Sequence, residues 1–212
     1  MRRRTVIACF AGAAALAAVG SAFANTFTVT SEKLTTANVP VTLTTVTLTA
    51  VADTYADQGA ATTNFGTATT LNVRSANTSN RRAFVRFDLS AIPTTARVQS
   101  ATLQMTMTTA PTASRSYEAD KVGATWTETA LTWNVQPAAG AATATVATGT
   151  TSNVVLSWNV KTDAAAFVTT PATNFGWRVK DVTENSATAR LGIFNAREAA
   201  SGRPTLVVVY AT

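Results

Sequence analysis

Three arginines and a tryptophan carry the chemistry in this sequence that best suits a ligand: Arg74, Arg86, Arg178 and Trp177. A guanidinium can meet a carboxylate through two parallel hydrogen bonds, and an indole ring can cover the apolar C–H face of a sugar. Arg74 and Arg86 fall on the polar phase of two expected strands, which would place both on one sheet face if the strands are neighbours. The alternative is that the arginines are solvated surface charges and the tryptophan belongs to the core.

Aspartates form a second candidate site. Asp53, Asp57 and Asp181 are candidate ligands of a structural calcium ion, because hard cations prefer carboxylate and carbonyl oxygens. The sequence has no EF-hand spacing, so the alternative is that these side chains cap turns and pair with arginines. Calcium is the candidate cofactor that the sequence suggests, and nothing in the sequence requires it.

The composition excludes several kinds of catalysis. The 212 residues contain no histidine, which removes the Ser-His-Asp triad, the Cys-His dyad and histidine-ligated zinc. Glu118, Glu128 and Glu184 are carboxylates of the type that cleave glycosides, but the sequence gives no reason to pair any two of them. We therefore expect a protein that is not an enzyme.

The first 24 residues have the pattern of a secretory signal peptide. A basic head at Arg2–Arg4 precedes an apolar run from Val6 to Val19, and Ala22-Phe23-Ala24 supplies the small residues of a cleavage site. The apolar run is too short to span a bilayer comfortably, so no membrane partner is expected after cleavage. The only cysteine, Cys9, leaves with this segment. We predict a secreted protein, extracellular or at the cell surface.

Cleavage would also change the charge of the chain. The sequence has 17 basic and 11 acidic residues, and loss of the three leading arginines leaves 14 basic residues against 11, a net charge of +3. Binding to nucleic acid needs a concentrated basic stripe, which so weak an excess does not supply. No nucleic-acid partner is therefore expected.

The elements that must position these side chains are short strands. Apolar and polar residues alternate in two runs between Arg82 and Met107, and Ile92-Pro93 separates the runs because proline cannot donate to a sheet ladder. About nine to eleven such runs recur at roughly 10- to 15-residue spacing, without a long helical pattern. This predicts an all-β, antiparallel β-sandwich of the jelly-roll type, with a closed barrel as the alternative. The valines at 207–209 predict a fully buried last strand.

The predicted organisation has three parts: a signal peptide at 1–24, a threonine-rich β extension at 25–50 and the sandwich, a single domain, at 51–212. The extension alternates from Thr26 to Leu48 and is rich in β-branched residues. It could supply the first strands of the domain, or a strand for the sheet of a neighbouring molecule. Self-association through the N-terminal strands is therefore a candidate interaction.

Six short motifs occur in an order that resembles one family, the DNRLRE-type domains that include carbohydrate-binding module family 96. The resemblance extends from Ala52 to Tyr210. The motifs are Asp53-Thr54-Tyr55, Asn64-Phe65-Gly66, Phe87-Asp88-Leu89-Ser90 with Ile92-Pro93, Ser100-Ala101-Thr102-Leu103, Trp126-Thr127-Glu128 with Leu131-Thr132-Trp133-Asn134, and Arg197-Glu198 with Arg203-Pro204-Thr205-Leu206.

The resemblance implies a secreted, non-catalytic jelly-roll module that binds polysaccharide, including acidic polysaccharides such as alginate. Polysaccharide, with an acidic one as the more specific expectation, is accordingly the predicted partner. The alternative is a structural surface, matrix or fibre subunit that assembles by β-strand addition. The threonine-rich residues 25–50, which could supply the added strand, suggest this alternative.

Overall fold

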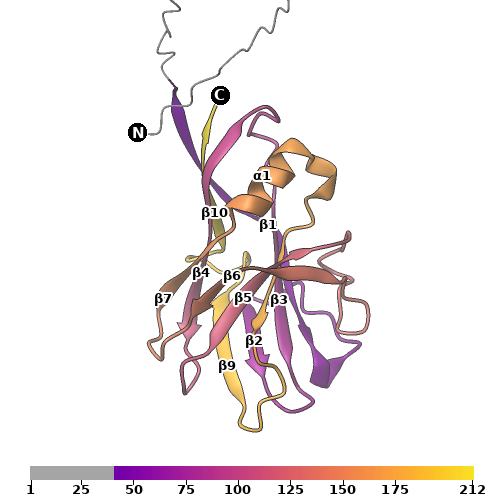
Figure 1. Ribbon diagram of the computed structural model, residues 1–212. Coiled ribbons are helices and arrows are strands. Elements are labelled where there is room, and N and C mark those ends of the chain that lie inside the picture. The colour runs from indigo at the N-terminus through magenta and orange to yellow at the C-terminus, as the bar shows by residue number, and fades with distance from the viewer. Residues whose placement is uncertain (1–40) are drawn as a thin grey trace, which may run out of the picture. The chain divides into compact units, whose positions relative to one another are not determined.

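Ten antiparallel strands make up almost half of residues 41–212, the part of the chain that the computed structural model describes (Figure 1). The predicted signal peptide and residues 25–40 lie outside the described residues. The elements are β1 (Leu43–Asp57), a 3-10 turn η1 (Gln58–Ala60), β2 (Thr70–Ser75), β3 (Arg81–Phe87), β4 (Arg97–Thr109), β5 (Ser116–Val122), β6 (Ala139–Ala147), β7 (Val154–Asn159), α1 (Lys161–Thr169), a 3-10 turn η2 (Pro171–Thr173), β8 (Trp177–Asp181), β9 (Arg190–Asn195) and β10 (Thr205–Ala211).

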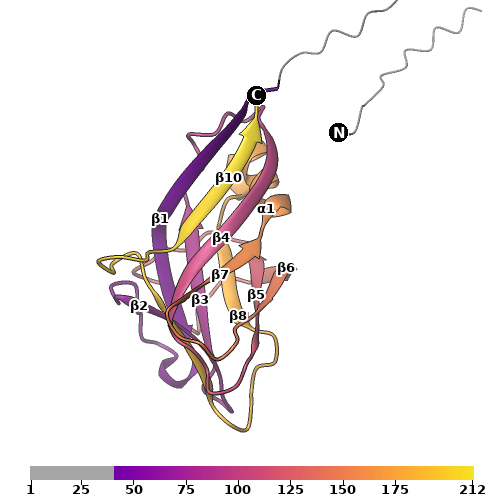
Figure 2. The ribbon, with the colours of Figure 1, turned by 90° about the vertical axis from the view of Figure 1, so that its left-hand side faces the viewer.

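Six of these strands close into a ring. β1 pairs with β10, and the order continues through β4, β9, β2 and β3, which pairs back with β1. β8, β5 and β6 extend the sheet from β3, and β7 pairs with β4 (Figures 1 and 2). The all-β prediction is confirmed. The sandwich prediction is not, because the strands form a closed six-stranded antiparallel barrel with added strands, which is the alternative that the sequence left open.

β1 closes the ring by changing partners along its length. Leu43–Thr49 pair with β10, the register shifts between Ala50 and Ala52, and the residues up to Asp57 pair with β3. A bulge of this kind bends a strand and increases its twist. The boundary predicted after residue 50 falls inside β1, so residues 43–50 belong to the barrel and not to a separate extension.

β3 is buried on both faces, which the alternating sequence did not predict. Ala83, Val85 and Phe87 point into the main core, as expected for one phase of the strand. Phe84, on the opposite phase, is fully buried in a second cluster under Trp126. The loop between β5 and β6 therefore covers part of the outer face of β3. By contrast, β10 is buried only in alternate positions, so the prediction of a fully buried last strand is wrong.

α1 packs its apolar face into the main core. The ring of Phe167 meets the ring of Trp177 edge-on at 5.1 Å between centroids, and the indole N–H of Trp177 donates to Asp163 Oδ2 at 2.8 Å. The alanines at 164–166 in the middle of α1 favour a helix. Among the described residues no helix has the length and apolar character needed to cross a membrane.

Candidate functional site

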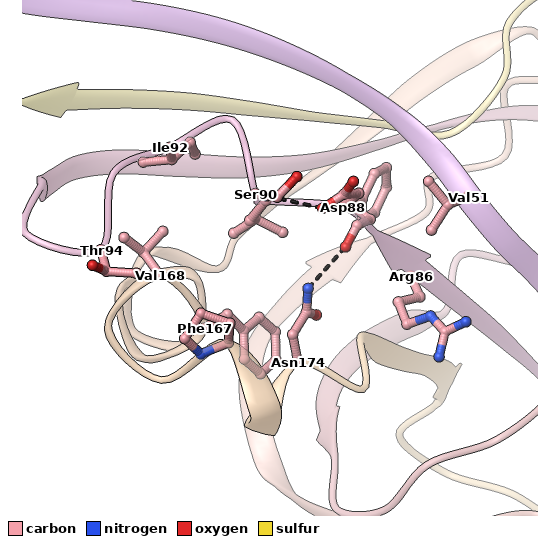
Figure 3. Close-up of a pocket in the computed structure, with 12 residues that line it drawn as sticks. Val51, Arg86, Asp88, Ser90, Ile92, Thr94, Phe167, Val168 and Asn174 are labelled. Carbon is pink, nitrogen blue, oxygen red and sulfur yellow. Dashed lines mark hydrogen bonds between the residues drawn. The ribbon is translucent and has the colours of Figure 1, made fainter.

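A pocket of about 430 Å³ lies where β3 ends, between the loop that follows β3 and the α1–η2 segment (Figure 3). Val51, Phe167 and Pro171 contribute apolar surface to its wall, and the polar groups include Arg86 and Asn174. The volume falls in the ~300–1,000 Å³ range of small-ligand pockets, which combine apolar walls with a few placed polar groups. The composition of this pocket suits a ligand that has both apolar faces and hydroxyl or carboxylate groups.

Asn174 is held by one end of its amide and has an unused acceptor at the other. Its Nδ2 donates to the carbonyl oxygen of Phe87 at 2.8 Å (Figure 3). Its Oδ1 has no solvent-exposed surface and no hydrogen-bond partner. Buried polar atoms without a partner are rare and costly in folded proteins. The amide oxygen of Asn174 is therefore a buried, unpaired acceptor in the wall of the pocket.

Arg86 contributes a positive charge to the pocket. Its guanidinium lies over the ring of Trp126, 5.4 Å from the ring centroid, and Arg86 takes part in none of the ion pairs formed by the described residues. Arg86 thus retains its capacity to pair with an anionic ligand. Asp88, a negatively charged residue of the same lining, is exposed at the rim of the pocket. Hydrogen bonds from the backbone N–H and the hydroxyl of Ser90 hold the pKa of the Asp88 carboxyl below its usual value.

A glycine determines how the η2–β8 segment approaches β3. Gly176 has a φ of +76°, and a Cβ at this position would lie 2.1 Å from the carbonyl oxygen of Val85. Only glycine fits both the positive φ and the close approach. The preceding Asn174 can then reach Phe87. Asn64 and Gly66 have the same spacing without a positive φ: the Asn64 amide donates to two carbonyl oxygens, and a Cβ on Gly66 would meet the Glu128 carbonyl.

The other predicted ligand-binding residues lie elsewhere. Trp177 has no exposed surface, so the prediction that it contacts a ligand needs correction: its ring fills the core. Arg74 lies opposite Arg81 in the β2–β3 pair, five residues and roughly 16 Å of strand from Arg86, and donates to Ser79 Oγ at 3.2 Å. Arg178 is paired with Asp120, at 2.6 Å. The structure therefore does not bring the four residues together.

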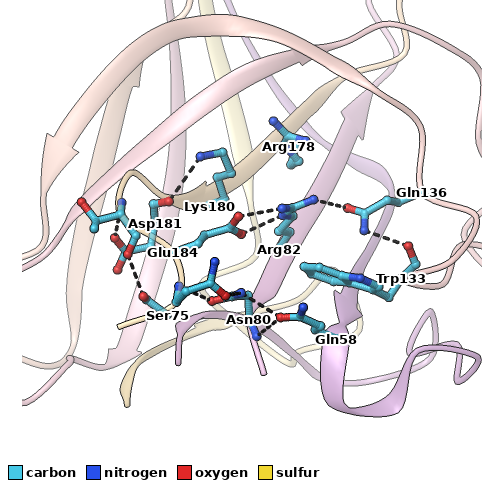
Figure 4. Close-up of polar contacts among 12 residues, drawn as sticks. Gln58, Ser75, Asn80, Arg82, Trp133, Gln136, Arg178, Lys180, Asp181 and Glu184 are labelled. Carbon is cyan, nitrogen blue, oxygen red and sulfur yellow. Dashed lines mark hydrogen bonds and ion pairs between the residues drawn. The ribbon is translucent and has the colours of Figure 1, made fainter. Parts of the chain in front are cut away.

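Arg178 belongs to a charged face on β3, β8 and β5 (Figure 4). Arg82 donates to both oxygens of Glu184, at 2.7 and 2.6 Å, and its guanidinium lies 4.4 Å from the ring centroid of Trp133. Lys180 pairs with Glu118. Because each cation of this face already has a carboxylate partner, the face offers an added anion less than Arg86 does.

The predicted calcium ligands also separate. Asp57 pairs with Arg81 at 2.8 Å and accepts the backbone N–H of Gly59. Asp181 accepts two hydrogen bonds from the guanidinium of Arg115, at 2.7 and 2.9 Å. For these two aspartates the structure has the turn caps and ion pairs of the alternative interpretation.

Asp53 instead lies with two glutamates that the sequence did not place in a cation site. One oxygen from each of Asp53, Glu128 and Glu198 lies within 4.8 Å of the other two; we call these residues the acidic trio. Burial raises the pKa of Asp53 to about 7, and the Glu198 and Glu128 carboxylates add to the rise against the hydrogen bond from the Arg197 backbone. All three residues lie in motifs that carried the family resemblance, which was the available signal.

The fold and the pocket define an all-β module that has a pocket of small-ligand size. The lining of this pocket suits a ligand with both polar and apolar parts. The sequence model of carbohydrate-binding module family 96 matches residues 44–210. The chain therefore belongs to carbohydrate-binding module family 96, as its motifs predicted. None of the curated proteins searched matches the chain.

Proposed function

We propose that this protein is a secreted, non-catalytic module that binds an acidic polysaccharide, with a uronate unit in the pocket beside Arg86. The observation that carries the proposal is a guanidinium without a carboxylate partner, that of Arg86, in the lining of a pocket that also has apolar walls. A uronate supplies the complement of this guanidinium, because its carboxylate can accept two parallel hydrogen bonds from Arg86. Pyranose C–H faces suit the apolar wall formed by Val51 and Phe167.

The absence of a catalytic role is inferred from composition. The chain has no histidine, and the carboxylates of the charged face are committed to arginine and lysine. A glycosidase needs one carboxyl group to donate a proton and another to act on the sugar. No carboxylate pair opens into the pocket, where Asp88 is the acidic residue of the lining.

Affinity electrophoresis and calorimetry with alginate, polygalacturonate and a neutral glucan test the proposal. We expect the uronate polymers to bind, and we expect Arg86→Ala to weaken that binding at least tenfold while the fold, followed by circular dichroism, is kept. Arg74→Ala is the matched control, because Arg74 also lacks a carboxylate partner but lies on β2, opposite Arg81 at the far end of β3 from Arg86. Failure of the wild-type protein to bind any of the polymers would refute the proposal.

The second candidate function, a subunit that assembles by strand addition, has one observation in its favour. Leu43–Thr49 of β1 pair with β10 along one edge, while β3 begins to pair only after this segment. The open edge carries no charged residue or proline, the usual protection against pairing with another chain. Size-exclusion chromatography of the wild type and of Thr45→Lys discriminates: assembly that the lysine abolishes supports this function, and a monomer in both forms rejects it.

A further inference from the structure

The acidic trio joins three segments that are far apart in the sequence. Asp53 comes from β1, Glu128 from the loop between β5 and β6, and Glu198 from the loop between β9 and β10. Arg197 is the cation beside them: its Nε lies 2.6 Å from Glu128 Oε1 and 3.0 Å from Glu198 Oε1, and its Nη2 donates to Glu128 Oε2 at 2.9 Å. One guanidinium therefore pairs with two of the three carboxylates, and Asp53 is left without an ion pair.

Two oxygens of the trio are left without partners. Glu198 Oε2 has no solvent-exposed surface and no hydrogen bond. Asp53 is 1% exposed and takes part in no ion pair among the described residues; Oδ2 accepts the backbone N–H of Arg197 at 2.8 Å, and no hydrogen bond of the described residues reaches Oδ1. A carboxylate as buried as that of Asp53 is strongly unfavourable without an ion-pair partner, and a buried oxygen without a hydrogen bond, such as Glu198 Oε2, adds to the cost. The two unpaired oxygens therefore point to a missing cation, independently of the number of acidic residues.

The ligand chemistry selects the type of cation. Three carboxylate groups are hard oxygen ligands, which suit Ca²⁺ or Mg²⁺, whereas a zinc site normally includes histidine or cysteine. The trio can supply three to six oxygens, depending on whether each carboxylate binds through one atom or two. Calcium accepts 6–8 oxygens in flexible geometry and completes its shell with water, but magnesium demands a near-ideal octahedron. Side chains from one strand and two loops suit the more flexible ion.

We propose that Asp53, Glu128 and Glu198 bind one calcium ion, which ties the β5–β6 and β9–β10 loops to β1. The site shares no residue with the pocket, so the proposal is independent of polysaccharide binding. A cation that binds only the folded state stabilises it by mass action. Because Glu198 keeps 23% of its side chain exposed, an ion has a path from solvent. Arg197 would remain as a partner of Glu128.

Calorimetric titration of the chelator-treated full chain with CaCl₂ and with MgCl₂ tests the site. We expect one Ca²⁺ per chain, with a Kd at or below roughly 1 mM, the weak end of extracellular modules, and weaker binding of Mg²⁺. Thermal unfolding should shift upward by several degrees in Ca²⁺ and return with EGTA. Absence of both the heat of binding and the thermal shift in the wild type would overturn the proposal.

Paired variants assign the site to the trio. Glu198→Gln keeps the shape of a partly exposed loop residue and should lower Ca²⁺ affinity at least tenfold. Glu184→Gln is the control, since Glu184 is also a half-buried glutamate paired with an arginine, on the charged face, and should bind Ca²⁺ as the wild type does. Equal affinities of the two variants would exclude the trio. If Glu198→Gln unfolds, the Ca²⁺ affinity of Asp53→Asn tests whether the trio is the site. Terbium luminescence of the wild type, with Ca²⁺ as competitor, provides a second test of cation binding.

Discussion

Gly176 lies against the backbone of Val85 so closely that no side chain fits between them: a Cβ would be 2.1 Å from the Val85 carbonyl oxygen. This contact brings the η2–β8 segment onto β3 and places Asn174 in the pocket. The geometry of the candidate site thus depends on a residue that contributes no side chain to it.

Gly176→Ala should therefore destabilise the fold and weaken ligand binding together. We expect a loss of about 2–4 kcal/mol in the free energy of unfolding, because a strained positive φ costs ~1–3 kcal/mol and the clash adds to it. Urea denaturation measures the loss. Gly149→Ala is the matched control: Gly149 also has a positive φ, +62°, but a Cβ there meets nothing within 4 Å. An equal loss in both variants would show that the contact with Val85 is unimportant.

Phe84→Ala should be among the most damaging core substitutions. Phe84 is fully buried between β3 and the loop that carries Trp126, with the two rings edge-on at 6.0 Å between centroids. Removing a buried phenylalanine ring costs ~3–5 kcal/mol. Denaturation and the fluorescence of Trp126 measure the effect. Val182→Ala, at a valine that is 45% exposed, should change stability by less than ~0.5 kcal/mol.

The stability of the calcium-free protein should fall as the pH rises from 4 to 7. Burial raises the pKa of Asp53 from 3.8 to about 7, so the folded chain holds its proton more tightly than the unfolded chain. This contribution to stability is fully present below the unfolded pKa and is lost as the pH rises through the folded pKa. Urea midpoints in EGTA at pH 5 and pH 8 measure it. Asp53→Asn should flatten the dependence; an unchanged slope would contradict the assignment.

Secretion gives a prediction about the N-terminus. If Ala22-Phe23-Ala24 is the cleavage site, the exported protein begins at Asn25 and lacks Cys9. Intact-mass spectrometry of the protein from the culture medium measures this, with the unprocessed chain made in vitro as the reference. A cell-retained protein that begins at Met1 would contradict the prediction.

Local pattern was enough to predict the strands but not how they close. The alternation around Phe87 and Leu103 predicted β3 and β4, because one face of each strand packs on the main core. The barrel closes through the shift between Ala50 and Ala52, and a change of partner within one strand leaves no periodic signal. For this reason the sequence could not decide between the sandwich and the barrel, two architectures with the same strand pattern, and the sandwich prediction is not confirmed.

The candidate site was predicted in part. Arg86 was chosen for its polar phase, and it does line the pocket. The same argument failed for Trp177, because a tryptophan that begins a strand after a turn gives no sign of which face it occupies. Glu128 and Glu198 were visible only as members of motifs. Their approach to Asp53 depends on the long-range closure of the barrel, which the sequence does not reveal.

The pairing of β1 with β10 has a mechanical consequence. Leu43 lies opposite Ala211, and the pairs run in order from there to Thr49 and Thr205. A force that separates residues 43 and 211 would act on these pairs one after another, like a zipper, instead of shearing all of them at once. A module tethered at these two residues should therefore open pair by pair at low load.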